Sequence, residues 1–156
     1  MREHQYGLTV TWTGNRGVGT ADARAYGRDH VVSDPGKPDL LGSSDPSFRG
    51  DPARWNPEEL LVASLSQCHM LWFLGLAAAE GVVVTDYVDR PTGTMTEESS
   101  GTGQFTEVVL RPEVTVRSED MVPKAEALHA VAHEKCFIAR SVNFPVHHRP
   151  TALVAA

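Results

Sequence analysis

The chain has 156 residues, of which 41% are hydrophobic and 22% are charged, and its formal net charge is −6. This is the composition of an ordinary soluble globular protein, and the length suits one domain over residues 1–156. The negative charge, with no run of lysine and arginine, argues against nucleic-acid binding. The first residues lack an apolar signal segment, and the longest apolar run, residues 70–79, is too short to cross a membrane. We therefore expect a cytoplasmic protein with no membrane partner.

The N-terminal third of the chain predicts a small antiparallel meander followed by a loop. Apolar and polar residues alternate over residues 6–13, which predicts a strand. Beyond the turn at residues 14–17, we expect two further strands over residues 18–26 and 29–33. Residues 34–55 are rich in proline, glycine, serine and aspartate and predict one long loop, the kind of segment that often covers a binding site.

The strongest local signal is the start of a long helix. Asn56 suits the N-cap, Pro57 suits the first helical position, and the acidic residues 58–59 complement the positive end of the helix dipole. We expect this helix to end near Glu80 and to stop at Gly81. Its middle is apolar on nearly every side, so it should be a buried central helix. In a domain of this size we expect it to be buried against a second copy of the chain.

The remaining residues predict two long strands, a second helix and a last strand. The strands should cover residues 82–95 and 105–117, and the helix should begin near Pro123 and end near Cys136. A final strand over residues 142–154 is interrupted by two prolines. The order β-β-β-α-β-β-α-β, with helices on mostly antiparallel sheets, predicts an α+β fold.

The chain has two cysteines, Cys68 in the central helix and Cys136 at the end of the second helix. They form no C-x-x-C pair and are too few for a four-cysteine zinc site or a disulfide framework. We therefore expect neither a metal nor a cofactor. Two interpretations remain, namely inert core thiols or a reactive pair that opens and closes a disulfide during turnover.

A family resemblance favours the reactive pair. The string NPEELL at residues 56–61, a cysteine ten residues after Glu58, the late Cys136 and the order of elements resemble the OsmC/Ohr family of osmotically induced and organic hydroperoxide resistance proteins. The resemblance covers essentially the whole chain. It implies an OsmC-like fold in an intertwined homodimer, with two sites at the subunit interface. It also implies a thiol-dependent peroxidase active in the response to oxidative stress.

The resemblance also implies residue roles. Cys68 corresponds to the peroxidatic cysteine and Cys136 to the resolving cysteine, while Glu58 corresponds to the glutamate of the site. Arg16, in a glycine-rich turn after the first strand, is the best match for the arginine of the family. Arg24 and Arg28 are the alternatives.

The chemistry of peroxide cleavage is consistent with these roles. The reaction needs a thiolate, and an apolar helix disfavours that charge unless a cation lies beside it. Arg16 can supply the cation, and Glu58 can hold the guanidinium by two parallel hydrogen bonds. Glu58 and Cys68 are ten positions apart, or roughly 15 Å along one helix. We therefore expect Arg16, Glu58 and Cys68 to meet only through the dimer.

An apolar pocket would select the substrate. If the segment 34–55 folds over the site, the pocket could be lined by the following large apolar side chains: Trp12, Phe48, Trp55, Met70 and Leu71. Such a lining would favour alkyl or lipid hydroperoxides over hydrogen peroxide, which has no apolar surface to bury. The expected partners are this organic hydroperoxide and a dithiol reductant, either a lipoyl protein or another thiol.

The histidines are expected to have no chemical role. His129 and His133 are four residues apart on a helix, as metal-binding pairs are, but no third ligand is obvious and both should face solvent. His69 points about 100° away from Cys68 on the helix, so it should not act as the base for that thiol. Residues 147–148, both histidine, fall in the last strand.

Two other functions stay open. His69 and Phe137 stand where many family members have an aromatic residue and a proline, respectively. One alternative is a protein of this fold that binds a ligand or senses redox state without turnover. The other is a cysteine-dependent hydrolase or transferase that uses Cys68 with a distant histidine and does not need Cys136.

Overall fold

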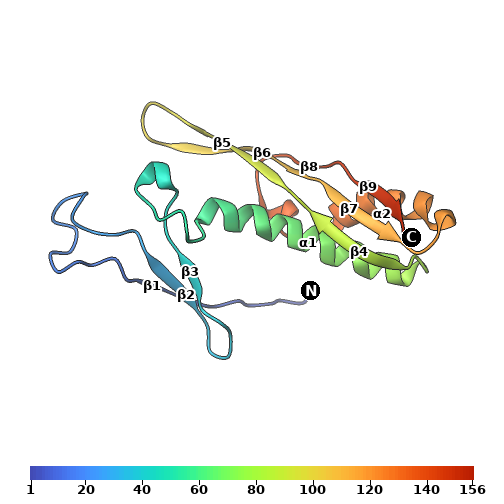
Figure 1. Ribbon diagram of the computed structural model, residues 1–156, viewed down its shortest axis with the longest axis horizontal. Coiled ribbons are helices and arrows are strands. Elements are labelled where there is room, and N and C mark those ends of the chain that lie inside the picture. Colours follow the sequence, from blue (N-terminus) through green and yellow to red (C-terminus); the bar gives the residue numbers. More distant parts are fainter. The chain divides into compact units, whose positions relative to one another are not determined.

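The computed structural model describes all 156 residues, which form two compact units, Met1–Leu60 and Leu61–Ala156. We refer to them as the N-terminal and the C-terminal unit. The boundary between them falls in the first turn of helix α1 (Pro57–Ala79), the long horizontal helix of Figure 1. The single domain over residues 1–156 stays a prediction.

The N-terminal unit contains a three-stranded antiparallel sheet in the order β1-β2-β3. The strands are β1 (Thr9–Trp12), β2 (His30–Ser33) and β3 (Leu40–Gly42). The strand predicted over residues 18–26 is wrong, because this segment is a series of turns. The Asn15 side-chain oxygen accepts hydrogen bonds from the backbone N–H groups of Gly17 and Gly19, at 2.9 and 3.0 Å. Both glycines have positive φ, so the chain turns where a strand would have to continue.

The segment 34–55, predicted to be one long loop, contains strand β3 and a short 3-10 helix, η1 (Pro46–Phe48). Asp45 caps η1 by accepting a hydrogen bond from the Ser47 backbone N–H at 2.7 Å. Strand β3 pairs with β2, and a Cβ atom on Gly42 would collide with the ring of His30. The glycine that suggested a loop is therefore the residue that allows close strand pairing at this point.

Helix α1 is confirmed within one residue of the expected ends. The Asn56 side-chain oxygen accepts from the Glu59 backbone N–H at 2.8 Å, and the Glu59 carboxylate accepts from the Asn56 N–H at 3.2 Å. This reciprocal capping box gives Glu59 a hydrogen-bonding role in addition to its effect on the dipole. Gly81, with φ of 73°, follows the helix and turns the chain into the next strand.

Only one stripe of α1 is buried in the single chain. Leu65, His69, Phe73 and Ala77 are buried at four-residue spacing, whereas Leu71 is 64% exposed. By length and composition α1 could span a membrane, which the short run at residues 70–79 did not predict. Core helices of soluble proteins meet the same criterion, and the buried stripe of α1 packs into the core of the C-terminal unit.

The C-terminal unit contains four strands between its helices instead of the two predicted. The strands are β4 (Val84–Asp89), β5 (Thr92–Glu97), β6 (Gly103–Leu110) and β7 (Pro112–Val116), followed after the second helix by β8 (Val146–His148) and β9 (Thr151–Val154). They form two sheets in the orders β4-β7-β9 and β5-β6-β8. The last strand is divided at Pro150 as expected. Its first half, β8, pairs in parallel with β6, and its second half, β9, pairs in parallel with β7.

Asp89 explains why the two long strands break. One of its carboxylate oxygens accepts from the Arg111 backbone N–H at 2.7 Å, and the other accepts from the Ser66 hydroxyl on α1 at 2.5 Å. Arg111 therefore does not continue the ladder, and Pro112, which follows it, has no N–H to donate. The two sheets meet at this break.

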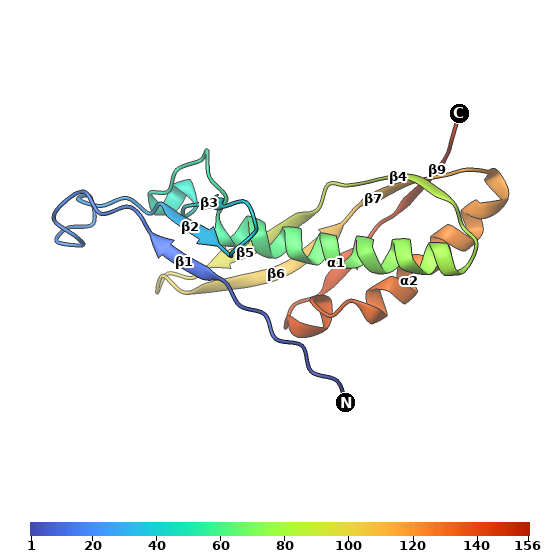
Figure 2. The same cartoon turned by 90° about the horizontal axis from the view of Figure 1, so that it is seen from below.

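The second helix, α2 (Val122–Lys135), is confirmed and lies beside the second half of α1 (Figure 2). Both helices pack on β7 through one hydrophobic cluster, whose buried members are Phe73, Ala77, Val82, Val114, Val116, Ala125, Leu128 and Ala132. A second cluster joins α1 to β6 and β8 through Leu65, Val108, Leu110 and Val146. The predicted α+β class with mostly antiparallel strands is confirmed.

Candidate functional site

The structure brings the two cysteines of the chain together in the C-terminal unit. Cys68 is half-buried on α1, and Cys136, which is 1% exposed, is the residue that caps the C-terminal end of α2. Both are free thiols, and they lie close enough for the Cys68 side chain to influence the pKa of Cys136. Two cysteines that are 68 positions apart in the sequence are thus neighbours in the fold.

The end of α2 fixes the position of Cys136. The backbone of Cys136 leaves the helix with φ of −66° and ψ of 110°, while its N–H still donates to the His133 carbonyl at 3.3 Å. A short 3-10 helix, η3 (Ala139–Ser141), follows, and the Ala139 N–H donates to the Cys136 sulfur at 3.4 Å. The thiol is therefore held by the chain on both sides of it.

The surroundings of Cys136 keep it protonated. Burial raises the pKa of the Cys136 thiol to about 11, and its hydrogen bond with Cys68 acts in the same direction, against a smaller opposing effect of the Ala139 N–H. At neutral pH Cys136 therefore retains its proton and can donate it in a hydrogen bond to the Cys68 sulfur. The two thiols are therefore unequal, because Cys136 is buried and holds its proton whereas Cys68 is only half-buried.

An aromatic pair lies beside the thiols. Trp72 is one turn after Cys68 on α1, and its ring contacts that of Phe137 edge to face, with centroids 5.5 Å apart. Phe137 follows Cys136 in the chain and is 67% exposed. Neither aromatic residue was among the site residues predicted from the sequence. The four-residue spacing from Cys68 and the adjacency to Cys136 were the signals that could have found them.

Arg16 and Glu58 belong to the N-terminal unit, and the structure does not join them. Arg16 is exposed at the tip of the turn that Asn15 organises, with its guanidinium beside Gly27, and it makes no ion pair. Glu58 lies in the first turn of α1, and its Oε2 atom is buried without a hydrogen-bond partner. A buried carboxylate oxygen without a donor is unfavourable, so Glu58 is chemically suited to receive a cation.

Of the alternative arginines, Arg28 is already occupied. Its guanidinium donates to the carbonyls of Ala23 and Tyr26, at 2.8 and 2.7 Å, and lies 3.9 Å from the centroid of the Tyr26 ring. Arg24 forms no ion pair and is exposed. Arg16 and Arg24 are therefore the two of these three whose guanidinium groups remain available.

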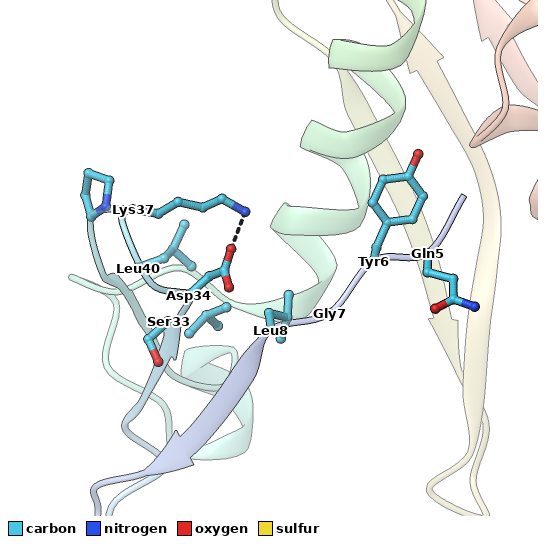
Figure 3. A pocket seen from close by; sticks show the side chains of 10 residues that line it. Gln5, Tyr6, Gly7, Leu8, Ser33, Asp34, Lys37 and Leu40 are labelled. Atoms are coloured by element: carbon cyan, nitrogen blue, oxygen red, sulfur yellow. Dashed lines mark ion pairs between the residues drawn. The ribbon is translucent and has the colours of Figure 1, made fainter. Parts of the chain in front are cut away.

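Most of the residues predicted to line a substrate pocket are exposed. Trp12, Phe48, Trp55 and Leu71 are between 40% and 64% exposed, and Met70 is half-buried. A pocket of about 820 Å³ in the N-terminal unit lies between the segment at residues 5–8 and the β2–β3 hairpin, where Lys37 pairs with Asp34 (Figure 3). None of the five residues contributes to it, and their role in substrate binding stays a prediction.

The expectation that His129 faces solvent is wrong. His129 is 2% and His69 1% exposed, and His69 Nε2 lies 3.0 Å from His129 Nδ1. Burial lowers the pKa of His69 to about 4 and that of His129 to about 3, with a further contribution from neighbouring histidines. His148, which was expected to have no role, stacks on His69 with centroids 5.6 Å apart. No three of the histidine, cysteine, aspartate and glutamate side chains are placed to hold a metal ion.

Comparison with known families agrees with this architecture. Residues 50–150 match the OsmC-like protein family, a range that includes α1, strands β4 to β8, α2 and both cysteines. The chain belongs to the OsmC-like protein family. The resemblance stated for the NPEELL string and the two cysteines is thereby confirmed, as is the OsmC-like fold. No curated protein matches this OsmC-like chain.

Solved structures of the family include close and distant relatives of this OsmC-like protein. An OsmC-like protein of unknown function from Vibrio cholerae is 35% identical, with a TM-score of 0.84, over 96% of this chain and 100% of its own. An organic hydroperoxide resistance protein from Legionella pneumophila, also described as a predicted redox protein, is 19% identical with a TM-score of 0.67, over 97% and 99% of the chains. One from Elizabethkingia anophelis is 17% identical with a TM-score of 0.67, over 99% and 100%. At these lower identities the likeness concerns the fold alone.

Proposed function

We propose that this protein is a thiol-dependent peroxidase that reduces organic hydroperoxides through Cys68 and Cys136 in the cytoplasm. The observation that carries the proposal is that the two thiols are neighbours, one half-buried and the other buried and protonated. Relatives of the same fold that are organic hydroperoxide resistance proteins support the same class of substrate.

The unequal thiols define an order of steps. The Cys68 thiolate attacks the outer oxygen of the hydroperoxide, the O–O bond breaks, and the alkoxide leaves as an alcohol after taking up a proton. Cys68 is then a sulfenic acid. The Cys136 sulfur attacks the Cys68 sulfur, an S–S bond forms, and the oxygen leaves as water. A dithiol reductant, either a lipoyl protein or another thiol, exchanges with this disulfide and returns both cysteines to the thiol state.

The Trp72–Phe137 pair supports an organic substrate. Its rings present apolar surface beside the thiols, and Phe137 is 67% exposed, so an alkyl or aryl group can bury area against it. Hydrogen peroxide gains nothing from this contact. The proposed preference for organic hydroperoxides therefore rests on residues near Cys68 and Cys136, in addition to the five pocket residues predicted from the sequence.

We further propose that the working form is a homodimer. Three features support it: the exposed apolar face of α1 around Leu71, the unpartnered buried oxygen of Glu58, and the unpaired Arg16. Ten residues separate Glu58 from Cys68 on α1, roughly 15 Å, so one arginine of the same chain cannot bridge both. At an interface between two copies, one arginine could instead pair with the Glu58 carboxylate of one copy and the Cys68 sulfur of the other.

Peroxide consumption tests the proposal. Wild type, Cys68→Ser and Cys136→Ser are compared with cumene hydroperoxide and with hydrogen peroxide, under a dithiol reductant. We expect turnover in wild type that is faster with cumene hydroperoxide, none in Cys68→Ser, and a single equivalent consumed by Cys136→Ser in the absence of reductant. A folded wild type with two titratable thiols and no turnover would refute the enzyme and leave ligand binding or redox sensing. Undiminished turnover in Cys136→Ser would instead favour a one-cysteine mechanism.

A further inference from the structure

A buried pair of histidines joins the two helices that carry the thiols. His69 follows Cys68 on α1, and His129 lies on α2, seven residues before Cys136. The His69 Nε2 and His129 Nδ1 atoms are 3.0 Å apart, so this pair is a direct polar link between α1 and α2. Around this link the surfaces in contact are apolar, with Phe73 stacked on His129 at a centroid distance of 4.2 Å.

Both imidazoles of the pair are neutral at physiological pH, because burial lowers the pKa of each well below its usual value. In a neutral pair one ring donates and the other accepts. The Nδ1 atom of His69 is buried without a partner. If His69 carries its proton on Nε2, its Nδ1 atom is an unpaired acceptor and not an unpaired N–H. We therefore assign His69 as the donor and His129 as the acceptor.

A hydrogen bond of this kind fixes how the helices align along their axes, which apolar contacts do not. A slip of one residue moves a helix by about 1.5 Å, enough to break the bond and leave two buried imidazoles unpaired. Seven residues are about two helical turns, so Cys136 lies on the face of α2 that His129 presents to α1. The same slip would change the distance between the sulfur atoms by an amount that disulfide geometry does not tolerate.

We propose that the His69–His129 hydrogen bond is a positioning device that holds the Cys68 and Cys136 sulfur atoms at the separation from which a disulfide forms. The proposal rests on the function proposed above for the relevance of that disulfide to turnover. Neither histidine contacts the reacting atoms, and both act through the helices that carry the thiols. A buried polar pair usually contributes less stability than apolar side chains of the same volume, and its advantage is a unique alignment.

Two substitutions at position 129 separate positioning from packing. In His129→Asn the amide oxygen can occupy the place of Nδ1 and still accept from His69, whereas His129→Leu keeps an apolar side chain and removes the bond. His133→Gln is the matched control, because it removes another histidine of the same helix and cluster without touching the bond. His69→Leu and His69→Gln form the equivalent pair on α1, because the glutamine amide can replace the Nε2 donor. They are used for the same measurement if His129→Leu does not fold.

The measurement is the equilibrium between the dithiol and the disulfide of each variant in mixtures of reduced and oxidised dithiothreitol, which requires no peroxide. As the Cys68–Cys136 bond forms, the disulfide of oxidised dithiothreitol is reduced to two thiols. We expect His129→Leu to disfavour the protein disulfide by about tenfold to 100-fold, and His129→Asn and His133→Gln to stay within about threefold of wild type. A folded His129→Leu that matches wild type would overturn the positioning role, as would a His129→Asn that behaves like the leucine variant. Absence of peroxide turnover would refute the proposed function and leave this equilibrium unaffected.

Discussion

The buried histidines predict that acid selectively destabilises the C-terminal unit. An unperturbed histidine has a pKa of about 6.5, whereas the folded protein lowers the pKa to about 4 for His69 and about 3 for His129. As the pH falls below about 6.5, the unfolded chain takes up protons that the folded chain cannot. Stability that is fully present above about pH 6.5 is therefore lost as the pH falls towards the folded pKa values. The other titratable groups of the cluster, His133 on α2 and His148 on β8, add no negative charge to offset a proton.

The size of this loss follows from the pKa values. Between about pH 6.5 and about pH 4.5, each buried histidine should lower the free energy of unfolding by about 2 kcal/mol, or roughly 4 kcal/mol for the two. A typical domain has a total stability of about 5–15 kcal/mol, so the effect is large enough to measure by urea denaturation at fixed protein concentration.

The comparison variant is the double substitution His69→Gln with His129→Asn, which can keep a hydrogen bond at this place but cannot titrate. We expect wild type to lose about 4 kcal/mol more than this variant over the same pH range. Carboxylates elsewhere titrate in both proteins and cancel in the difference. Equal losses in the two proteins would show that His69 and His129 do not stay neutral in the folded state, and the assignment of a neutral buried pair would be wrong.

Three further predictions concern packing, capping and substrate choice. Phe73→Ala should lower the free energy of unfolding by about 3–5 kcal/mol because Phe73 is fully buried. Leu71→Ala, at an exposed site, should change the free energy of unfolding of the monomer by less than about 0.5 kcal/mol. The same Leu71→Ala variant should weaken dimer formation, as measured by sedimentation. Asn56→Ala should lower the stability of the chain by about 1 kcal/mol in thermal denaturation through loss of the capping box, and an unchanged midpoint would contradict the role of the cap. Phe137→Ala should slow consumption of cumene hydroperoxide by about tenfold and leave hydrogen peroxide unaffected, and an equal effect on both would refute a substrate contact.

Both helices could be predicted from the sequence because their ends carry local signals. Asn56 and Pro57 mark the start of α1, and Gly81 marks its end, all through chemistry within a few residues. The break in the long strands could not be predicted in the same way. Although Pro112 is a local signal, the break also depends on Asp89 binding the backbone of Arg111, a contact between residues 22 positions apart.

The candidate site was predicted in part. The proximity of Cys68 and Cys136 followed from a family resemblance and not from periodicity, because nothing local relates residues 68 positions apart. His129 was assigned to solvent because no third metal ligand was obvious, although it lies four residues after Ala125 and three before Ala132, on the stripe that packs inward. Its burial depends on a partner, His69, from another helix, and such a pair becomes evident only when both helices are placed.

Mass spectrometry after addition of one equivalent of cumene hydroperoxide tests the central claim, that Cys68 attacks the peroxide and Cys136 resolves the product. We expect wild type to lose two hydrogen atoms as the Cys68–Cys136 disulfide forms. Cys136→Ser should gain one oxygen atom, which a sulfenic-acid reagent captures at Cys68, and Cys68→Ser should remain unchanged. Oxidation of Cys136 in the Cys68→Ser variant at the wild-type rate, or no mass change in wild type, would contradict the roles assigned to the two thiols.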